Sequence, residues 1–206
     1  MLPINKKQHW ENVYTTKQSN EVSWTQEIPK TSLDFIHEFN LPKSASIIDI
    51  GGGDGKLVDY LLAEGFQNIT VLDISETAIN KAKLRLGAKA QQVNWIVSDI
   101  TEFAPQATYD CWHDRATFHF LTEQHEINKY LDIARNAVQG YLTIGTFSDK
   151  GPEKCSMLNV HKYSKESLQK ELSNGFEKIR CIEEDHSTPF NTKQNFVFCS
   201  FKKSIN

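Results

Sequence analysis

Residues 46–57, SIIDIGGGDGKL, decide the fold. The apolar first half of this stretch predicts a short buried strand of a parallel sheet. The glycines after it predict a tight turn, because glycine adopts backbone angles that other residues avoid and lets the main chain approach a ligand closely. From Lys56 to Leu62 the pattern becomes helical. Since ligands of open α/β sheets bind beyond the carboxyl ends of the strands, this turn predicts a nucleotide-like site.

Three classes of site use glycine turns, and the spacing of the glycines differs between them. A phosphate-binding P-loop requires Gly, four residues, and then Gly-Lys-Ser/Thr. Here only three residues separate Gly51 from Gly55, and Leu57 follows Lys56. The dinucleotide fingerprint requires glycine or alanine at its sixth position, which Lys56 occupies. What remains is an acidic residue followed by Gly-x-Gly-x-Gly, namely Asp49, Gly51, Gly53 and Gly55.

This pattern resembles the first motif of class I S-adenosylmethionine-dependent methyltransferases. The next two expected strands, 69–75 and 93–97, add an acid each, Asp73 and Asp99. The resemblance implies that Asp73 accepts hydrogen bonds from both ribose hydroxyls of the cofactor and that Asp99 meets the adenine amino group. The alternative for each aspartate is a cap on the helix that follows. We expect these residues to bind S-adenosylmethionine: Asp49, Gly51, Gly53, Gly55, Asp73, Ile74, Asp99 and Ile100.

Polar residues end the fourth expected strand, Tyr109–Arg115, where this fold faces the transferable methyl group. Burying such groups without partners is costly, so they are candidates for function. Residues 114–117, Asp-Arg-Ala-Thr, resemble a signature of thiopurine-type and some protein-lysine methyltransferases, with Ala116 in place of the glycine usual in the lysine-directed version.

The candidate catalytic residues are His113, Asp114 and Arg115. His113 is the candidate base because imidazole titrates near neutrality. The alternative is structural: an Asp114–Arg115 ion pair and a hydrogen-bonded His113 would then shape the loop.

The N-terminal residues 5–27 combine polar side chains with aromatic ones, including Trp10, Tyr14 and Trp24. They predict a helix and loop whose rings either pack on the body of the protein or form a lid over the cofactor, since aromatic side chains dominate both packing and recognition.

The rest of the chain alternates between expected helices and strands. Helices are expected at 31–39, at 75–86 with Ser75 as N-cap, at 122–138 with Thr122 as N-cap and Gly140 at its end, and at 164–172. A fifth strand is expected at 141–147, and the alternating segments 176–184 and 195–201 predict a terminal antiparallel hairpin. The long connection 148–163 is expected to contact the acceptor, because long loops at this edge of a sheet are usually functional.

Composition narrows the function classes. A net charge of −3 gives no broad attraction to nucleic acid or to anionic membranes. The four cysteines form no Cys-x-x-Cys pair, so they predict no metal site and are consistent with reduced thiols in a cytosol-like compartment. No apolar run is long enough to span a bilayer, and residues 1–7 lack the apolar core of a signal peptide.

We therefore expect a single α/β domain over residues 1–206, with residues 1–45 as an N-terminal helical or lid segment. The resemblance implies a Rossmann-like three-layer sandwich whose seven-stranded, mostly parallel sheet has the order 3-2-1-4-5-7-6. It implies methyl transfer from S-adenosylmethionine to a small molecule or a protein lysine, without nucleic acid, membrane or metal, in the cytoplasm, by a monomer or a dimer. The alternatives are a nicotinamide-dependent oxidoreductase, which the missing third glycine disfavours, and a non-catalytic cofactor-binding module.

Overall fold

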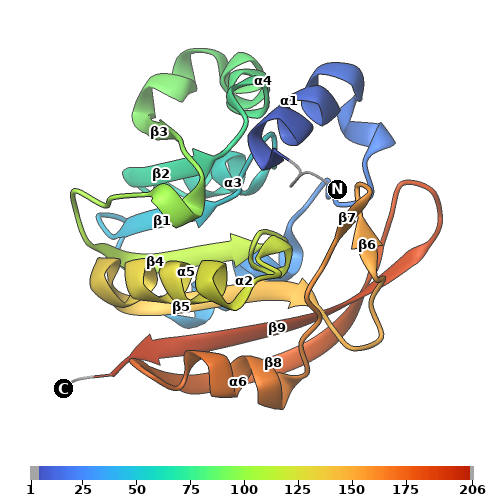
Figure 1. Cartoon of the computed structure of the whole chain (residues 1–206). Helices are drawn as coiled ribbons and strands as arrows, with labels where there is room; N and C mark the ends of the chain where they lie inside the picture. The colour runs from blue at the N-terminus through green and yellow to red at the C-terminus, as the bar shows by residue number, and fades with distance from the viewer. Residues whose placement is uncertain (1–4, 205–206) are drawn as a thin grey trace.

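A seven-stranded sheet forms the centre of the protein (Figure 1). The structure is a computed structural model that describes residues 5–204, so the first four residues of the expected N-terminal segment lie outside it. The strands lie in the order β3-β2-β1-β4-β5-β9-β8. The labels β6 and β7 belong to a small separate hairpin, so this order is the expected 3-2-1-4-5-7-6. The predicted fold class is confirmed.

Six strands run in the same direction, and β9 alone runs opposite to them, because it pairs antiparallel with both β5 and β8. The strands are β1 (Ser46–Ile50), β2 (Asn68–Asp73), β3 (Val93–Val97), β4 (Tyr109–Arg115), β5 (Val138–Phe147), β8 (Phe176–Ser187) and β9 (Lys193–Lys203). In β1, every residue from Ile47 to Ile50 is buried, as its apolar sequence predicts for a strand covered on both faces. The switch from β1–β2 to β1–β4 pairing opens a crevice at the carboxyl end of β1, where ligands of such sheets bind.

Helices cover both faces of the sheet (Figure 1). One apolar cluster joins the sheet to α2 (Lys30–Glu38) and α3 (Leu57–Ala63), and a second cluster joins it to α5 (Gln124–Ala137) and α6 (Lys165–Leu172). α4 (Glu76–Leu86) follows β2, and the Ser75 hydroxyl accepts a hydrogen bond from the backbone N–H of Ala78 at 3.1 Å, which confirms the predicted N-cap. α1 (Lys6–Thr16) lies next to α4.

Two predicted boundaries around α5 are wrong. The helix begins at Gln124 with Glu123 at its N-cap position, not Thr122. Gly140 does not end the helix but lies inside β5. A Cβ at Gly140 would lie 2.3 Å from the carbonyl oxygen of Asp110, at the point where the β4–β5 register shifts. The glycine therefore serves a close approach of two backbones and not a turn.

The expectation of reduced thiols is wrong for two of the cysteines. Cys181 of β8 and Cys199 of β9 face each other directly in the strand register and form a disulfide. Their separation of 18 residues along the chain gave no motif from which to predict the pair. Cys111 and Cys155 are free and buried. Disulfides are more typical of oxidising compartments, so the cytoplasmic location stays a prediction.

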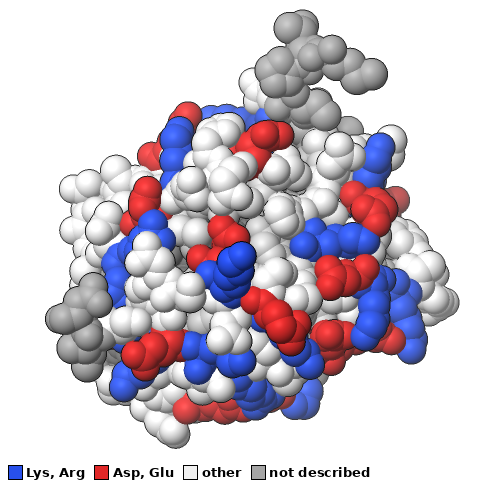
Figure 2. Space-filling view, turned by 60° about the horizontal axis from the view of Figure 1, so that its bottom comes forward, with Lys and Arg blue, Asp and Glu red and all other residues white. Residues whose placement is uncertain are grey.

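No helix within residues 5–204 is both long enough and apolar enough to cross a membrane. On the face shown in Figure 2, basic and acidic side chains are intermixed and separated by uncharged residues. This mixed pattern agrees with the small net charge of the sequence.

Candidate active site

A cavity of about 520 Å³ lies at the carboxyl ends of the parallel strands. Its wall is built by the glycine turn, the ends of β2, β3 and β4, the aromatic side chains of the N-terminal segment, and the hairpin of β6 (Lys154–Cys155) and β7 (Leu158–Asn159). Most of the predicted site residues line it, namely Asp49, Gly51, Gly55, Asp73, Ile74, Asp99, Ile100, His113 and Arg115. Gly53 and Asp114 do not.

The glycine turn needs its first and third glycines. Gly51 and Gly53 have φ of +64° and +50°, which side chains rarely allow. A Cβ at Gly51 would lie 1.7 Å from Oγ1 of Thr117, and one at Gly53 would lie 2.7 Å from the Tyr14 hydroxyl. The turn is therefore pressed against the exit of β4 on one side and against α1 on the other, which explains why Gly53 does not line the cavity.

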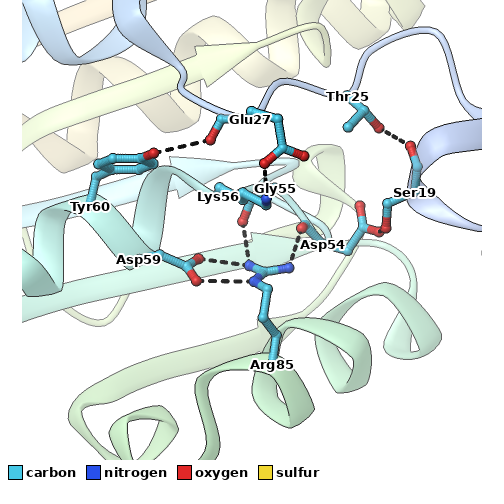
Figure 3. A network of polar contacts seen from close by, with 9 residues as sticks. All are labelled: Ser19, Thr25, Glu27, Asp54, Gly55, Lys56, Asp59, Tyr60 and Arg85. Carbon is cyan, nitrogen blue, oxygen red and sulfur yellow. Dashed lines mark hydrogen bonds and ion pairs between the residues drawn. The ribbon is translucent and has the colours of Figure 1, made fainter. Parts of the chain in front are cut away.

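An arginine on α4 holds the turn through its backbone carbonyl groups (Figure 3). The Arg85 guanidinium donates to the carbonyl oxygens of Asp54 and Gly55 at 2.5 and 2.8 Å and pairs with the carboxylate of Asp59. On the other side, the Ser19 hydroxyl donates to the Asp54 carboxylate at 2.7 Å. Because the glycines themselves provide no side-chain packing, these contacts fix the turn.

Asp73 ends β2 beside this turn. Its Oδ1 accepts a hydrogen bond from the backbone N–H of Ser75 at 2.8 Å, and its Oδ2 would lie 3.1 Å from a Cβ on Gly53. Burial, together with the nearby Asp54 and Asp49, raises the pKa of this carboxyl to about 7. The helix cap is Ser75, so the capping alternative does not account for Asp73.

Asp99 follows β3 and caps the next helix, whereas its contact with adenine stays a prediction. Its Oδ1 accepts hydrogen bonds from the backbone N–H and the hydroxyl of Thr101, both at 2.8 Å, and so caps the short helix Ile100–Glu102. The residue also lines the cavity. Capping and ligand contact are therefore compatible at this position.

His113 is buried between two partners. Its Nδ1 lies 2.7 Å from Oδ1 of Asp49, and its Nε2 lies 2.8 Å from the hydroxyl oxygen of Ser32 on α2. Only 2% of its surface is exposed. With both ring nitrogens engaged, the imidazole has no free nitrogen to accept a substrate proton in this arrangement.

The structure does not support Asp114 as a catalytic residue. Its side chain is fully buried on the α5 side of the sheet, where Oδ1 accepts from the backbone N–H groups of Thr117 and Phe118 at 3.0 and 3.2 Å. Oδ2 accepts from the Tyr130 hydroxyl at 2.8 Å. Burial raises the pKa of Asp114 to about 6. Through these hydrogen bonds the Asp114 carboxylate shapes the turn after β4. Asp114 faces away from its neighbours His113 and Arg115 because alternate residues of a strand face opposite sides of the sheet.

Arg115 points to the cavity side of the sheet. Its Nη1 donates to the carbonyl oxygen of Trp24 at 2.9 Å, and its guanidinium lies 5.2 Å from the centre of the Phe196 ring. Its Nε and Nη2 have no hydrogen-bond partner within the described residues. The ion pair with Asp114 that the sequence allowed is not formed.

Comparisons with known proteins agree with this geometry. A family model described as a methyltransferase domain matches residues 47–139, from β1 to the start of β5. The chain is 34% identical over 88 residues to malonyl-[acyl-carrier protein] O-methyltransferase 2 of Ilyobacter polytropus, which covers 42% of this chain and 34% of that protein. It is 23% identical over 186 residues to human EEF1A lysine methyltransferase 2, which covers 84% of this chain and 75% of that protein.

The fold has solved relatives as well. The N-methyltransferase NodS of Bradyrhizobium japonicum, solved with S-adenosyl-L-homocysteine, superposes with a TM-score of 0.72 and 16% identity over 98% of this chain and all of that one. The chain therefore has the fold of S-adenosylmethionine-dependent methyltransferases, and its residues 47–139 match the methyltransferase-domain model. It spans only 19%, 34% and 41% of the length of three of the curated relatives that it matches.

Aromatic rings from the N-terminal segment line the cavity. The centre of the Trp10 ring lies 5.6 Å from that of Trp24 and 5.0 Å from that of Phe120, in edge-to-face contacts. α1 is fixed in this position by its Glu11 carboxylate, which accepts hydrogen bonds from the backbone N–H groups of Glu76 and Thr77 at the start of α4. The rings therefore pack on the body of the protein, as one of the two interpretations predicted, and a lid over the cofactor stays a prediction.

Three residues of the site were missed in the sequence. Ser32 and Arg85 act through contacts with residues that are distant in the chain, and Glu11 accepts a hydrogen bond from the backbone N–H of Glu76, which lies 65 residues later. No local pattern identifies such partners. One residue of the expected acceptor loop, Cys155, lines the cavity, and contact of this loop with the acceptor stays a prediction. Burial raises the pKa of the Cys155 thiol to about 11, so the thiol stays protonated at neutral pH.

Proposed function

We propose that this protein transfers a methyl group from S-adenosylmethionine to a small-molecule acceptor inside the cavity. The observation that carries the proposal is the arrangement of the glycine turn, Asp73 and Asp99 around one cavity that aromatic side chains cover. Bound there, S-adenosylmethionine supplies a methyl group on a sulfonium, which is a good leaving group for in-line displacement.

The donor set agrees with this cofactor. Asp73 and Asp99 offer carboxylate oxygens to ribose hydroxyls and to the adenine amino group. Gly51 brings main chain to the cavity wall without a side chain. Four carboxylates line this part of the cavity, Asp49, Asp54, Asp73 and Asp99, and they favour a ligand that carries the positive charge of a sulfonium.

In this proposal the protein catalyses by position. The rings of Trp10, Tyr14 and Trp24 exclude water, and the acceptor is held against the methyl group in the remaining space. His113 orients Asp49 and does not take a proton, because both of its nitrogens are engaged.

A second candidate acceptor is a protein amine. It is favoured by the similarity to a human enzyme named EEF1A lysine methyltransferase 2 along 84% of this chain. Ala116, where the lysine-directed signature has glycine, separates this chain from that version. The nicotinamide alternative is disfavoured by the antiparallel β9–β8 pair in addition to the glycine spacing.

Two measurements test the proposal. Isothermal titration with S-adenosylmethionine, S-adenosylhomocysteine and NAD should show binding of the first two only. Incubation of the protein with methyl-radiolabelled cofactor and cell extract should place the label in the small-molecule fraction, with Asp73→Ala as control. Label in the protein fraction would favour the second candidate, and binding without any turnover would indicate a non-catalytic module.

A further inference from the structure

The positive charges in the cavity wall are not equivalent. Four lysine and arginine side chains in the described range line the cavity: Lys6, Lys56, Arg85 and Arg115. The first three form ion pairs, with Glu126, Glu27 and Asp59. Arg115 forms no ion pair with any described carboxylate.

The surroundings of Arg115 explain why its charge is uncompensated. The charges of two carboxylates, Glu184 and Asp49, favour the charged guanidinium without contacting it. Glu184 instead accepts a hydrogen bond from the Thr31 hydroxyl at 2.6 Å, and Asp49 faces His113. A cation that is removed from water and has no nearby counter-ion is costly, and burial lowers the pKa of Arg115 to about 10.

The free donors of Arg115 have a defined geometry. Nη1 is used by the Trp24 carbonyl, whereas Nε and Nη2 are shielded from solvent without a partner. Nε–H and the adjacent N–H of the guanidinium form a planar fork that matches the two oxygens of a carboxylate. Leaving both donors unpaired costs free energy that an anionic ligand would offset.

The charge of Arg115 also affects its neighbours. Burial, and after it the Arg115 charge, lower the pKa of His119 to about 3 and lower that of His186. Both imidazoles are therefore neutral near pH 7, and neither competes with Arg115 for an anion. Among the carboxylates that line the cavity, Asp49 acts on Arg115 from a distance, and Asp49 is already in contact with His113.

We propose that Arg115 anchors the acceptor, and that the acceptor is a small, flat, apolar molecule with a carboxylate or similar planar oxyanion. This inference rests on the proposed function and specifies its substrate class. Flatness follows from the walls, because Trp24, Phe147 and Phe196 line the cavity together with Arg115. The ammonium of a lysine side chain is repelled at this end of the cavity, which favours the small-molecule acceptor over the protein one.

The test compares three probes of similar shape on the full-length protein loaded with S-adenosylhomocysteine: benzoate, benzamide and benzylamine. Titration calorimetry should give at least about tenfold tighter binding of benzoate than of benzamide, and no binding of benzylamine. The benzoate preference should weaken with added salt. Equal binding of benzoate and benzamide, or preferred binding of benzylamine, would overturn the inference on the wild-type protein alone.

Two variants test whether the preference for benzoate depends on Arg115. Arg115→Met should remove the preference for benzoate, and Arg115→Lys should retain part of it, because lysine keeps the charge and loses the fork. A benzoate preference that persists in a folded Arg115→Met protein would assign the anion to another residue and refute the role of Arg115. Binding of S-adenosylhomocysteine in the first titration reports separately on the proposed function: its loss in the wild type refutes methyl transfer, whereas its presence without a benzoate preference refutes only the anchor.

Discussion

Nδ1 of His113 lies 2.7 Å from Oδ1 of Asp49, and this contact joins the residue at the end of β4 to the acidic residue of the glycine motif. Because the Ser32 hydroxyl lies 2.8 Å from Nε2 on the other side of the ring, His113 is fixed rather than free. The residue that the sequence indicated as a base therefore has the geometry of a group that positions Asp49.

The first prediction separates these two roles. In His113→Ala, the buried Asp49 loses its partner, so the protein should lose stability and bind S-adenosylhomocysteine at least about tenfold more weakly, as expected for the loss of a charge-assisted hydrogen bond. Turnover at saturating cofactor should fall by less than about tenfold. Calorimetry measures the cofactor affinity, thermal melting the stability and kinetics the turnover. Ser32→Ala, which keeps the Asp49 contact, is the control, and a loss of about 10²–10⁴ in turnover with unchanged cofactor affinity would identify a base instead.

The second prediction concerns pH. The pKa of Asp73 is raised from 3.8 to about 7 in the folded protein. The contribution of this carboxyl to stability is thus fully present below about pH 4 and is lost as the pH rises to about 7. Without cofactor, Asp73→Asn should therefore gain stability relative to the wild type as the pH rises from 5 to 8, which chemical denaturation at each pH can measure.

Cofactor binding should show the opposite trend. Only the ionised carboxylate accepts hydrogen bonds from both ribose hydroxyls, so wild-type affinity should rise with pH through about 7. In Asp73→Asn this rise should disappear and affinity at pH 8 should fall at least about tenfold. Parallel pH profiles for the two proteins, measured by calorimetry, would show that Asp73 does not contact the ribose.

Much of the fold could be predicted because its signals are local. The apolar run of β1, the N-cap at Ser75 and the alternation in β8 and β9 each lie within a few residues of the element that they specify. Gly140 was misinterpreted because glycine marks both helix ends and close backbone contacts, and only the position of Asp110 separates these cases. The Cys181–Cys199 pair likewise depends on strand register.

The candidate site was predictable to the extent that residues follow strand ends. Asp73, Asp99, His113 and Arg115 reach one cavity because the carboxyl ends of parallel strands meet at one edge. Their roles depend on partners that no spacing indicates. Asp114 faces the opposite side of the sheet from its neighbours in β4, where its carboxylate accepts a hydrogen bond from the Tyr130 hydroxyl.

The third prediction tests the close approach of Gly51 in the glycine turn to Thr117. Gly51→Ala places a Cβ 1.7 Å from the Thr117 hydroxyl at a φ of +64°, so it should cost more than the roughly 1–2 kcal/mol expected for a left-handed residue alone. Gly65→Ala is the matched control, because Gly65 has a φ of +87° with nothing within 4 Å. The double variant Gly51→Ala, Thr117→Ala should recover part of the loss. Additive effects in a double-mutant cycle of unfolding free energies would show that the two residues do not clash.

The last prediction concerns Ala116, which occupies the position of the glycine in the lysine-directed signature. The structure gives Ala116 a φ of +69°, in the left-handed region where a Cβ is unfavourable. Ala116→Gly removes this strain, and the greater freedom of glycine in the unfolded chain offsets part of the gain. The expected result is a net stabilisation of about 0.5–1 kcal/mol, or about 1–4 °C in melting temperature for a chain of this length. Ala78→Gly, in the buried first turn of α4, is the control and should destabilise, since glycine is unfavourable in a helix. A loss of stability in Ala116→Gly would mean that the methyl group of Ala116 contributes more by packing against the neighbouring apolar cluster than it costs in backbone strain.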